Sequence, residues 1–205
     1  MNDIDNILAI EWEMFQKVNA GGPKAACQLM PEAFYAMRFG QFAAWPQDAR
    51  DAYAHDLRTA KAAGRNLMAE KYIRMMEHTD PAGYRQLAAD LPLPTERQHA
   101  LADDINARLL RQTEALFRQY PLVSRSARPL YADGDSEYDT SIETYQRGEL
   151  LTYSEATLTA LLRHVSALEA QGISLVRRIL ENSIRYYGFD SLEQAEAACA
   201  EEVDE

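Results

Sequence analysis

The sequence predicts an all-α fold, an irregular multi-helix bundle formed as a single domain of roughly eight to ten helices. Apolar residues recur along the chain at three- and four-residue spacing, which is the period of an amphipathic helix. No run alternates apolar and polar residues between turn signals, as a half-buried strand would. No segment repeats at a fixed period, which argues against a helical repeat array. The length of 205 residues suits one domain with a substantial core.

Charge and composition exclude several classes of function. The formal net charge is −11, and an acidic surface repels nucleic-acid backbones and anionic lipid, so neither nucleic acid nor a membrane is expected as a partner. The cysteines, Cys27 and Cys199, lie far apart in the sequence and indicate a reducing compartment. The first residues lack the basic region of a secretory signal, and no apolar run approaches the length of a membrane span. We therefore expect a cytoplasmic protein.

Four helices are expected before residue 80, at about 5–19, 31–45, 48–63 and 64–79. Gly21 and Gly22 end the first helix, and Pro31 suits the first position of the second. Pro46 separates the second helix from the third. Gly64 either caps the third helix or lets it continue into the fourth.

Six more helices are expected in the rest of the chain, at about 80–90, 95–120, 141–147, 152–171, 174–187 and 191–201, the last of them fraying. A Leu-Pro-Leu-Pro connector at 91–94 separates the first two, because each proline disfavours helix before it. Capping boxes are predicted at Thr95 with Gln98, at Thr140 with Glu143 and at Thr152 with Glu155. The glycines that should end helices are Gly148, Gly172 and Gly188.

The stretch at about 120–140 has no apolar period, and a loop of this length in a compact domain is usually functional or disordered. Its Arg125 and Arg128 could clamp a phosphate or carboxylate. The commoner alternative is a loop that covers the bundle and carries surface arginines.

The helix at 64–79 has an apolar stripe and a polar face, and we expect the other helices to pack around it. The polar face carries Asn66, Glu70, Arg74 and His78, with Glu77 beside them. These residues could supply an acid, a base and an anion clamp. The plainer alternative is a solvated face with pairs such as Glu70 with Arg74, each contributing about 0.2–0.5 kcal/mol.

Glu11 falls within the apolar stripe of the first helix. Burial of a carboxylate there costs free energy unless a cation pairs with it or a donor hydrogen-bonds to it. Arg38 and Gln41 on the next helix are the expected partners. The arrangement could be a binding site or a structural ion pair, because both perturb pKa values.

The segment 143–154 places further polar side chains around two helix ends, and the backbone amides near Thr152 could bind an anion. Capping alone also explains Thr152 and Glu155. Evidence for a metal is weak: Glu96 and His99 have the Glu-x-x-His spacing of di-iron bundles, but the companion motifs are missing. No metal site is predicted, and the sequence names no cofactor.

Several short sequence motifs, taken together, resemble those of one family: EWEMF at 11–15, GG with CQ at 21–28, MR with QF at 37–42, GRNL with EKYIRMME at 64–77, and ETYQRGELLTYS at 143–154. The chain is similar, over nearly its whole length, to the uncharacterised bacterial family named domain of unknown function 4125. The resemblance implies an intracellular prokaryotic protein of one domain, with no established activity. The residues that match its pattern are Glu11, Trp12, Arg38, Gln41, Asn66, Glu70, Lys71, Arg74, Glu77, Glu143, Tyr145, Gly148, Glu149, Thr152 and Tyr153.

One departure from that pattern concerns the Cys27 region. The resemblance implies an acidic residue after the Cys-Gln pair, where this chain has Leu29 and Met30. The departure argues against a role for that region.

The polar residues beside the apolar stripes of these helices are more numerous than the packing of a core requires. A core favours apolar residues, because each buried polar group needs a hydrogen-bond partner. We therefore hypothesise one polar pocket between helices that binds a small polar or anionic metabolite, with Glu70 or Glu143 as acid or base. The expected ligand-binding residues are Glu11, Arg38, Gln41, Asn66, Lys71, Arg74, Glu77, Tyr145, Glu149 and Tyr153. The alternative is a non-enzymatic helical module that binds a protein partner, which the sequence does not identify.

Overall fold

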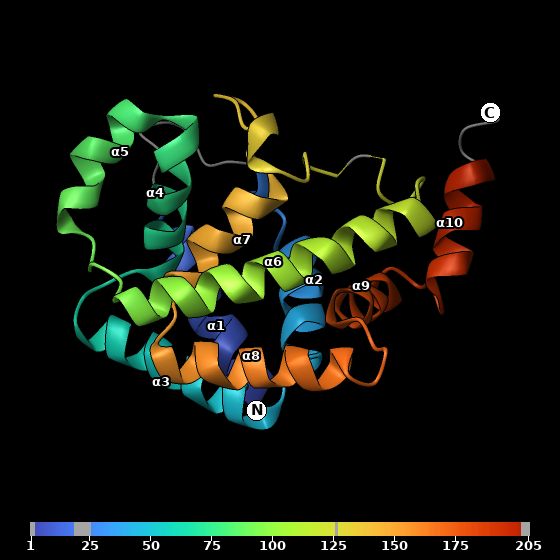
Figure 1. Ribbon diagram of the computed structural model, residues 1–205, viewed down its shortest axis with the longest axis horizontal. Coiled ribbons are helices and arrows are strands. Elements are labelled where there is room, and N and C mark those ends of the chain that lie inside the picture. The colour runs from blue at the N-terminus through green and yellow to red at the C-terminus, as the bar shows by residue number, and fades with distance from the viewer. Residues whose placement is uncertain (1–2, 19–25, 126, 202–205) are drawn as a thin grey trace.

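The computed structural model describes residues 3–18, 26–125 and 127–201, and within these ranges its only regular structure is helical. The predicted all-α fold class is confirmed (Figure 1). The α-helices are α1 Asp3–Gln16, α2 Pro31–Ala43, α3 Gln47–Ala62, α4 Leu67–Thr79, α5 Pro81–Leu87, α6 Glu96–Gln119, α7 Ile142–Leu150, α8 Glu155–Glu169, α9 Leu175–Tyr186 and α10 Leu192–Glu201. Short 3-10 turns are η1 Ala26–Leu29, η2 Ala88–Asp90 and η3 Ala132–Gly134. In the described ranges, no helix combines the length and apolarity needed to cross a membrane.

Most helix ends follow local chemistry. The Thr95 hydroxyl accepts a hydrogen bond from the Gln98 amide, and the Gln98 side chain accepts one from the Thr95 amide, so the capping box predicted for α6 is present. Gly172 and Gly188 have positive φ after α8 and α9, as C-terminal glycines of helices do. The predicted end of the first helix at residues 19–22 lies outside the described residues.

Three local predictions for α7 and α8 are wrong. Gly148 does not end α7, which continues to Leu150. The N-caps are Ser141 and Ser154 rather than the predicted threonines, because these serine hydroxyls accept from the amide three residues later. A Cβ atom at Gly148 would lie 3.0 Å from Met75 Cγ and 3.2 Å from the Lys71 carbonyl oxygen. The glycine therefore allows α7 to approach α4 closely.

The bundle is built from pairs of packed helices. α4 packs on α7, α8 packs between α3 and α6, and α2 packs most extensively on α9. The long α6 crosses the face seen in Figure 1, with α7 behind it. The largest apolar cluster joins residues of α1, α3, α4, α6 and α8, and a smaller one joins α6, α9 and α10.

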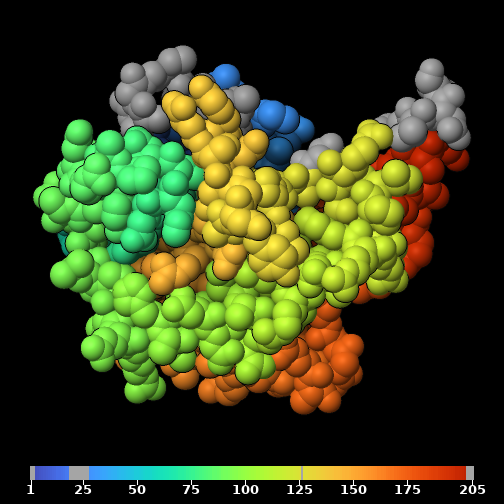
Figure 2. All heavy atoms as spheres, turned by 45° about the horizontal axis from the view of Figure 1, so that its top comes forward, coloured from blue at the N-terminus to red at the C-terminus, as the bar shows by residue number. Residues whose placement is uncertain are grey.

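The chain between α6 and α7 follows the surface and is tied to the start of α7. The amides of Ile142 and Glu143 donate to the carbonyls of Pro129 and Leu130. Figure 2 shows this yellow segment between the green α4–α5 region and the C-terminal half of α6. It thereby brings the Arg128 region beside α7.

Candidate functional site

Arg38 of α2 is buried and links two carboxylates that are far apart in the sequence. Its Nε donates to Glu11 Oε2 at 2.8 Å, and its Nη2 donates to the other oxygen of the same carboxylate. Its Nη1 donates to Glu149 Oε1 and to Gln41 Oε1, each at 2.8 Å. The pairing of Glu11 with Arg38 expected from the sequence is therefore present, and it extends to α7.

The Glu11 and Glu149 carboxylates accept further hydrogen bonds from other buried side chains. Lys71 Nζ donates to Glu149 Oε2 at 2.5 Å, and Gln41 Nε2 donates to Glu149 Oε1 at 3.1 Å. The hydroxyl of Tyr153 donates to Glu149, and that of Tyr53 donates to Glu11 Oε1 at 2.6 Å. We call these seven residues the Arg38 network: Glu11, Arg38, Gln41, Tyr53, Lys71, Glu149 and Tyr153.

The Arg38 network lies in the interior and its formal charge is balanced. The four charged residues are between 0% and 8% exposed, and two carboxylates face two cations. Burial alone raises the pKa of Glu149, but the charges of Arg38 and Lys71 and their hydrogen bonds outweigh it and hold that pKa well below its usual range. Burial and the Glu149 charge raise the pKa of Tyr153 well above its ordinary value, so the phenol stays a donor.

Stability should therefore fall in acid through Glu149. Because the folded-state pKa is lowered, the contribution of this carboxylate is complete above the ordinary value of 4.5 and is lost as pH falls through the folded value. We expect Glu149→Gln to flatten the loss of unfolding free energy below pH 4.5, measured by urea denaturation across a pH series. Glu32→Gln on α2 is the control, since no cation in the described residues pairs with that exposed carboxyl. Equal acid slopes in wild type and Glu149→Gln would contradict the assignment.

A cavity of about 520 Å³ lies beside the Arg38 network, between α2, α6, α7, α8 and α9. Its walls are mainly aliphatic and aromatic. The polar lining residues are Gln41, Arg128, Tyr145, Gln146, Glu149 and Tyr153. An apolar space with a few convergent polar groups is typical of a small-molecule site.

Two of these polar groups have unused capacity. Arg128 is exposed, donates to the Thr140 carbonyl at 3.1 Å, and has no ion-pair partner in the described part of the chain. Its guanidinium carbon lies 5.3 Å from the centre of the Tyr145 ring, over which Lys71 Nζ also lies, at 3.7 Å. The side-chain oxygen of Gln146 is buried and accepts no hydrogen bond from any described residue.

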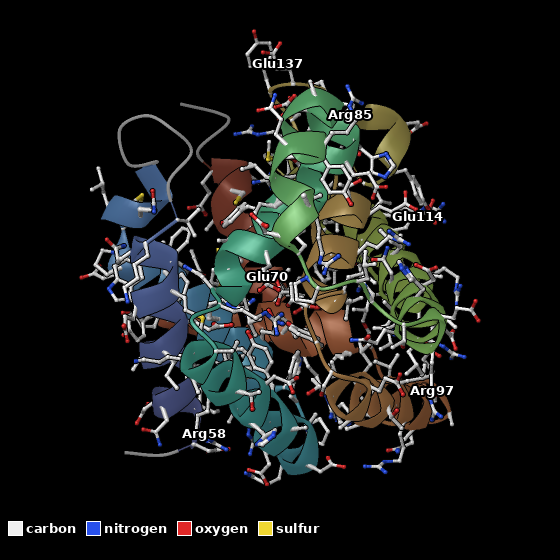
Figure 3. All side chains as sticks on the ribbon, turned by 90° about the vertical axis from the view of Figure 1, so that its left-hand side faces the viewer. Arg58, Glu70, Arg85, Arg97, Glu114 and Glu137 are labelled. Carbon is white, nitrogen blue, oxygen red and sulfur yellow. The ribbon has the colours of Figure 1, made fainter. Side chains whose placement is uncertain are left out.

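Two predicted residues on or beside α4, Asn66 and Glu70, do not line this cavity. Asn66 caps the helix, accepting from the Ala69 amide and donating to the Met14 carbonyl. Glu70 is 6% exposed and lies near the middle of the molecule in Figure 3. It pairs with Arg65 through two hydrogen bonds of 2.8 and 2.7 Å, so the expected pair with Arg74 is absent.

Three more predicted residues lie on separate hollows. Arg74 donates to the Pro92 carbonyl at 2.7 Å, and with Glu77 it lines a hollow under the 91–94 connector. Glu143 Oε2 accepts from the Ala132 amide at 2.8 Å and lines a hollow beside α6. The structure thus brings neither Glu70 nor Glu143 into the cavity, and their catalytic role stays a prediction.

The anion site predicted at the start of α8 is taken by an internal carboxylate. Asp56 Oδ2 accepts from the Ser154 amide at 3.0 Å and from the Thr157 hydroxyl at 2.7 Å. A helix N-terminus attracts negative charge, and here a residue of α3 supplies it.

Sequence reasoning missed Tyr53 as a polar member of the Arg38 network. Tyr53 lies on α3 and is 2% exposed. A buried tyrosine hydroxyl usually has a hydrogen-bond partner. A tyrosine at a buried position of this helix could therefore have indicated a polar partner in the interior.

Comparison with known proteins identifies a family but no activity. The family model described as "Protein of unknown function (DUF4125)" matches residues 2–197. No curated protein and no solved structure matches the chain. The match covers nearly the whole sequence, and the chain therefore belongs to the DUF4125 family.

Proposed function

We propose that the protein binds a small organic anion with an apolar body in the cavity beside the Arg38 network. The observation that carries the proposal is the charge balance of the lining. Of the lining residues, Glu149 and Arg128 carry full charges. Arg38 and Lys71 form ion pairs with Glu149, whereas Arg128 forms no ion pair with any described residue. An anionic head group would supply that counter-charge.

The apolar walls and Gln146 define the rest of the ligand. Aliphatic and aromatic side chains from α2, α4, α6, α7, α8 and α9 favour an apolar body through surface burial. The buried Gln146 oxygen has no donor among the residues that the structure describes, and such a group costs about 1–3 kcal/mol when unsatisfied. A hydroxyl or N–H group on the ligand would satisfy it.

The Arg38 network has a supporting role in this proposal. Its members come from five segments and hold Gln41, Glu149 and Tyr153 in fixed positions at the polar side of the cavity. Both oxygens of the Glu149 carboxylate are already hydrogen-bonded. Glu149 is therefore a fixed part of the cavity wall in this proposal and does not act as a proton acceptor. The proposal is therefore binding, without a catalytic step.

Replacing Arg128 by glutamine should remove the preference for an anionic head. Octanoate, 1-octanol and octyltrimethylammonium share one chain and differ in head-group charge, and their affinities are measurable by isothermal titration calorimetry. We expect wild type to bind octanoate most tightly and the cation least. Arg128→Gln should weaken octanoate binding about tenfold and leave octanol unchanged, because it removes one charge-assisted contact.

Arg125→Gln is the matched control, since Arg125 is an exposed arginine of the same loop that does not line the cavity. It should leave all three affinities unchanged. Equal affinity of wild type for the three probes, or an equal effect of both variants, would contradict the proposal.

One observation favours the second candidate, a module that binds a protein. Leu29, Met30, Met37 and Phe39 are large apolar side chains on or just before α2, and they are 41–67% exposed. Exposed apolar groups can mark an interaction surface. Native mass spectrometry of the protein purified from its own host separates the two candidates. A bound small molecule supports the cavity, whereas a bound protein chain lost on Phe39→Ser with Met30→Ser supports the module.

A further inference from the structure

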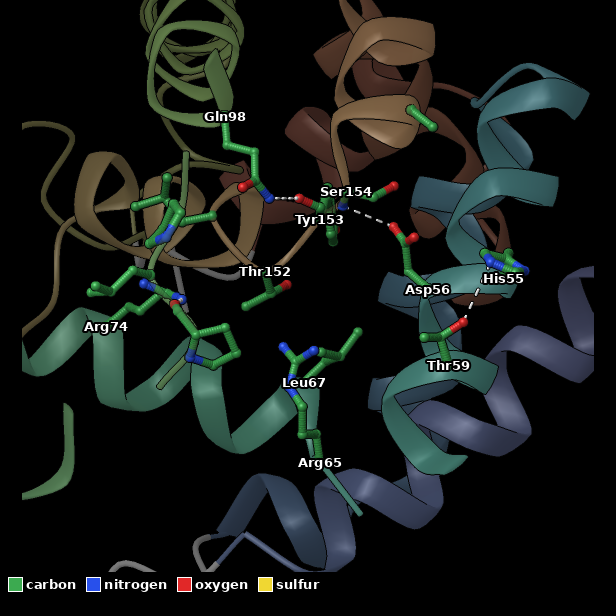
Figure 4. A pocket seen from close by; sticks show the side chains of 15 residues that line it. His55, Asp56, Thr59, Arg65, Leu67, Arg74, Gln98, Thr152, Tyr153 and Ser154 are labelled. Atoms are coloured by element: carbon green, nitrogen blue, oxygen red, sulfur yellow. Dashed lines mark hydrogen bonds between the residues drawn. The ribbon is translucent and has the colours of Figure 1, made fainter. Parts of the chain in front are cut away.

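Another hollow, of about 420 Å³, lies between α3, α4, the 91–94 connector and the turn from α7 to α8 (Figure 4), and it shares Arg74 with the hollow under the connector. Of its lining residues, Tyr153 alone is shared with the cavity described above. Its lining is rich in polar groups, among them Arg65, Arg74, Asp56, Thr152 and Gln98. The two spaces therefore differ in chemistry as well as in place.

Arg74 forms no direct ion pair among the described residues, although the charges of Glu70 and Glu77 act on it from a distance. Its Nη2 donates to the Pro92 carbonyl at 2.7 Å, and its Nε is buried and has no hydrogen-bond partner among the described residues. No carboxylate of the described chain lies within ion-pair distance of it. Burial lowers the pKa of Arg74, and the charge of Glu70 opposes this effect. A guanidinium in this state lacks acceptors.

The neighbouring charges of the hollow are already engaged. Arg65 uses Nε and Nη2 for Glu70, which leaves Nη1 without a hydrogen bond in the described residues. The Asp56 carboxylate is held by the start of α8. His55 lies 3.4 Å from the Thr59 hydroxyl. Unused donor nitrogens therefore remain on two arginines that approach from different elements.

We propose that this hollow is a second binding site, for an oxyanion of the phosphate type, with Arg74 as its principal cation and Arg65 as its second. A phosphate presents several acceptor oxygens in different directions, and it can therefore bind two guanidinium groups at once. A carboxylate offers two oxygens in one plane, so it matches two guanidinium groups that approach from different elements less well than a tetrahedral oxyanion does. This site does not depend on the function proposed above.

Titration with inorganic phosphate at constant ionic strength tests the site, with the arginine Nε–H resonances followed by ¹⁵N–¹H NMR. We expect a saturable shift of the Arg74 resonance, and at least tenfold weaker binding in Arg74→Gln. Phenyl phosphate is the second probe. Tighter binding of the ester indicates an organic phosphate as the natural ligand, whereas equal binding indicates the free ion.

Testing each variant with the ligand of the other site shows whether its effect is confined to its own site. Arg128→Gln should leave phosphate binding intact, and Arg74→Gln should leave octanoate binding intact. Arg74→Lys, which keeps the charge but not the planar fork, should bind phosphate with intermediate affinity and replaces Arg74→Gln if that variant does not fold. A shift that never saturates, or unchanged phosphate affinity in the Arg74 variants, would overturn the proposal, whatever happens with octanoate.

Discussion

Replacing Arg38 by methionine is expected to lower the free energy of unfolding by about 3–5 kcal/mol, because it leaves a buried carboxylate without its cation. Glu11 is 0% exposed and would keep only the Tyr53 hydroxyl as a partner. Glu149 would keep Lys71. Since a typical domain has about 5–15 kcal/mol of stability, the loss should be evident in urea denaturation followed by circular dichroism.

A second variant separates the unpaired charge from lost packing. Glu11→Leu combined with Arg38→Met removes the charge together with its partner, and should be more stable than Arg38→Met alone. Lys17→Met is the surface control: Lys17 and Glu13 form an exposed pair at 2.7 Å, which water screens, so no measurable change is expected. If Arg38→Met behaved like Lys17→Met, the Arg38 network would not be a determinant of the fold.

Replacing Gly40 by alanine should destabilise the protein by about 1–3 kcal/mol through overpacking of α2 against α9. A Cβ atom there would lie 2.1 Å from Ser183 Oγ and 2.8 Å from the Ile179 carbonyl oxygen. The sign is diagnostic, because alanine in place of glycine within a helix otherwise stabilises by roughly 0.5–1 kcal/mol. Thermal and urea unfolding of the two proteins measure the difference.

Adding Ser183→Ala to this variant should recover part of the loss and no more. The hydroxyl contact disappears, but the backbone oxygen of Ile179 stays in place. Gly40→Ala that is more stable than wild type would show that α2 and α9 do not approach as closely as the structure has them.

The sequence predicts the helical fold class and most helix positions because these depend on neighbours in the chain. The capping box of Thr95 and the helix-ending glycines 172 and 188 are local hydrogen-bond and φ requirements, which short stretches carry by themselves. The cost of burying Glu11 among apolar residues is also a local signal, and it pointed to Arg38 as the answering cation.

The choice among chemically equivalent partners needed the tertiary structure. Glu70 pairs with Arg65 rather than Arg74, and the predicted single pocket is divided into a cavity beside the Arg38 network and separate hollows at Arg74 and Glu143. Likewise Gly148, which reads as a helix end, serves the approach of α7 to α4. The sequence by itself determined which residues form helices and which polar groups require partners. Packing between distant segments decided which partners they meet, because contacts across the bundle depend on helix positions that no local pattern encodes.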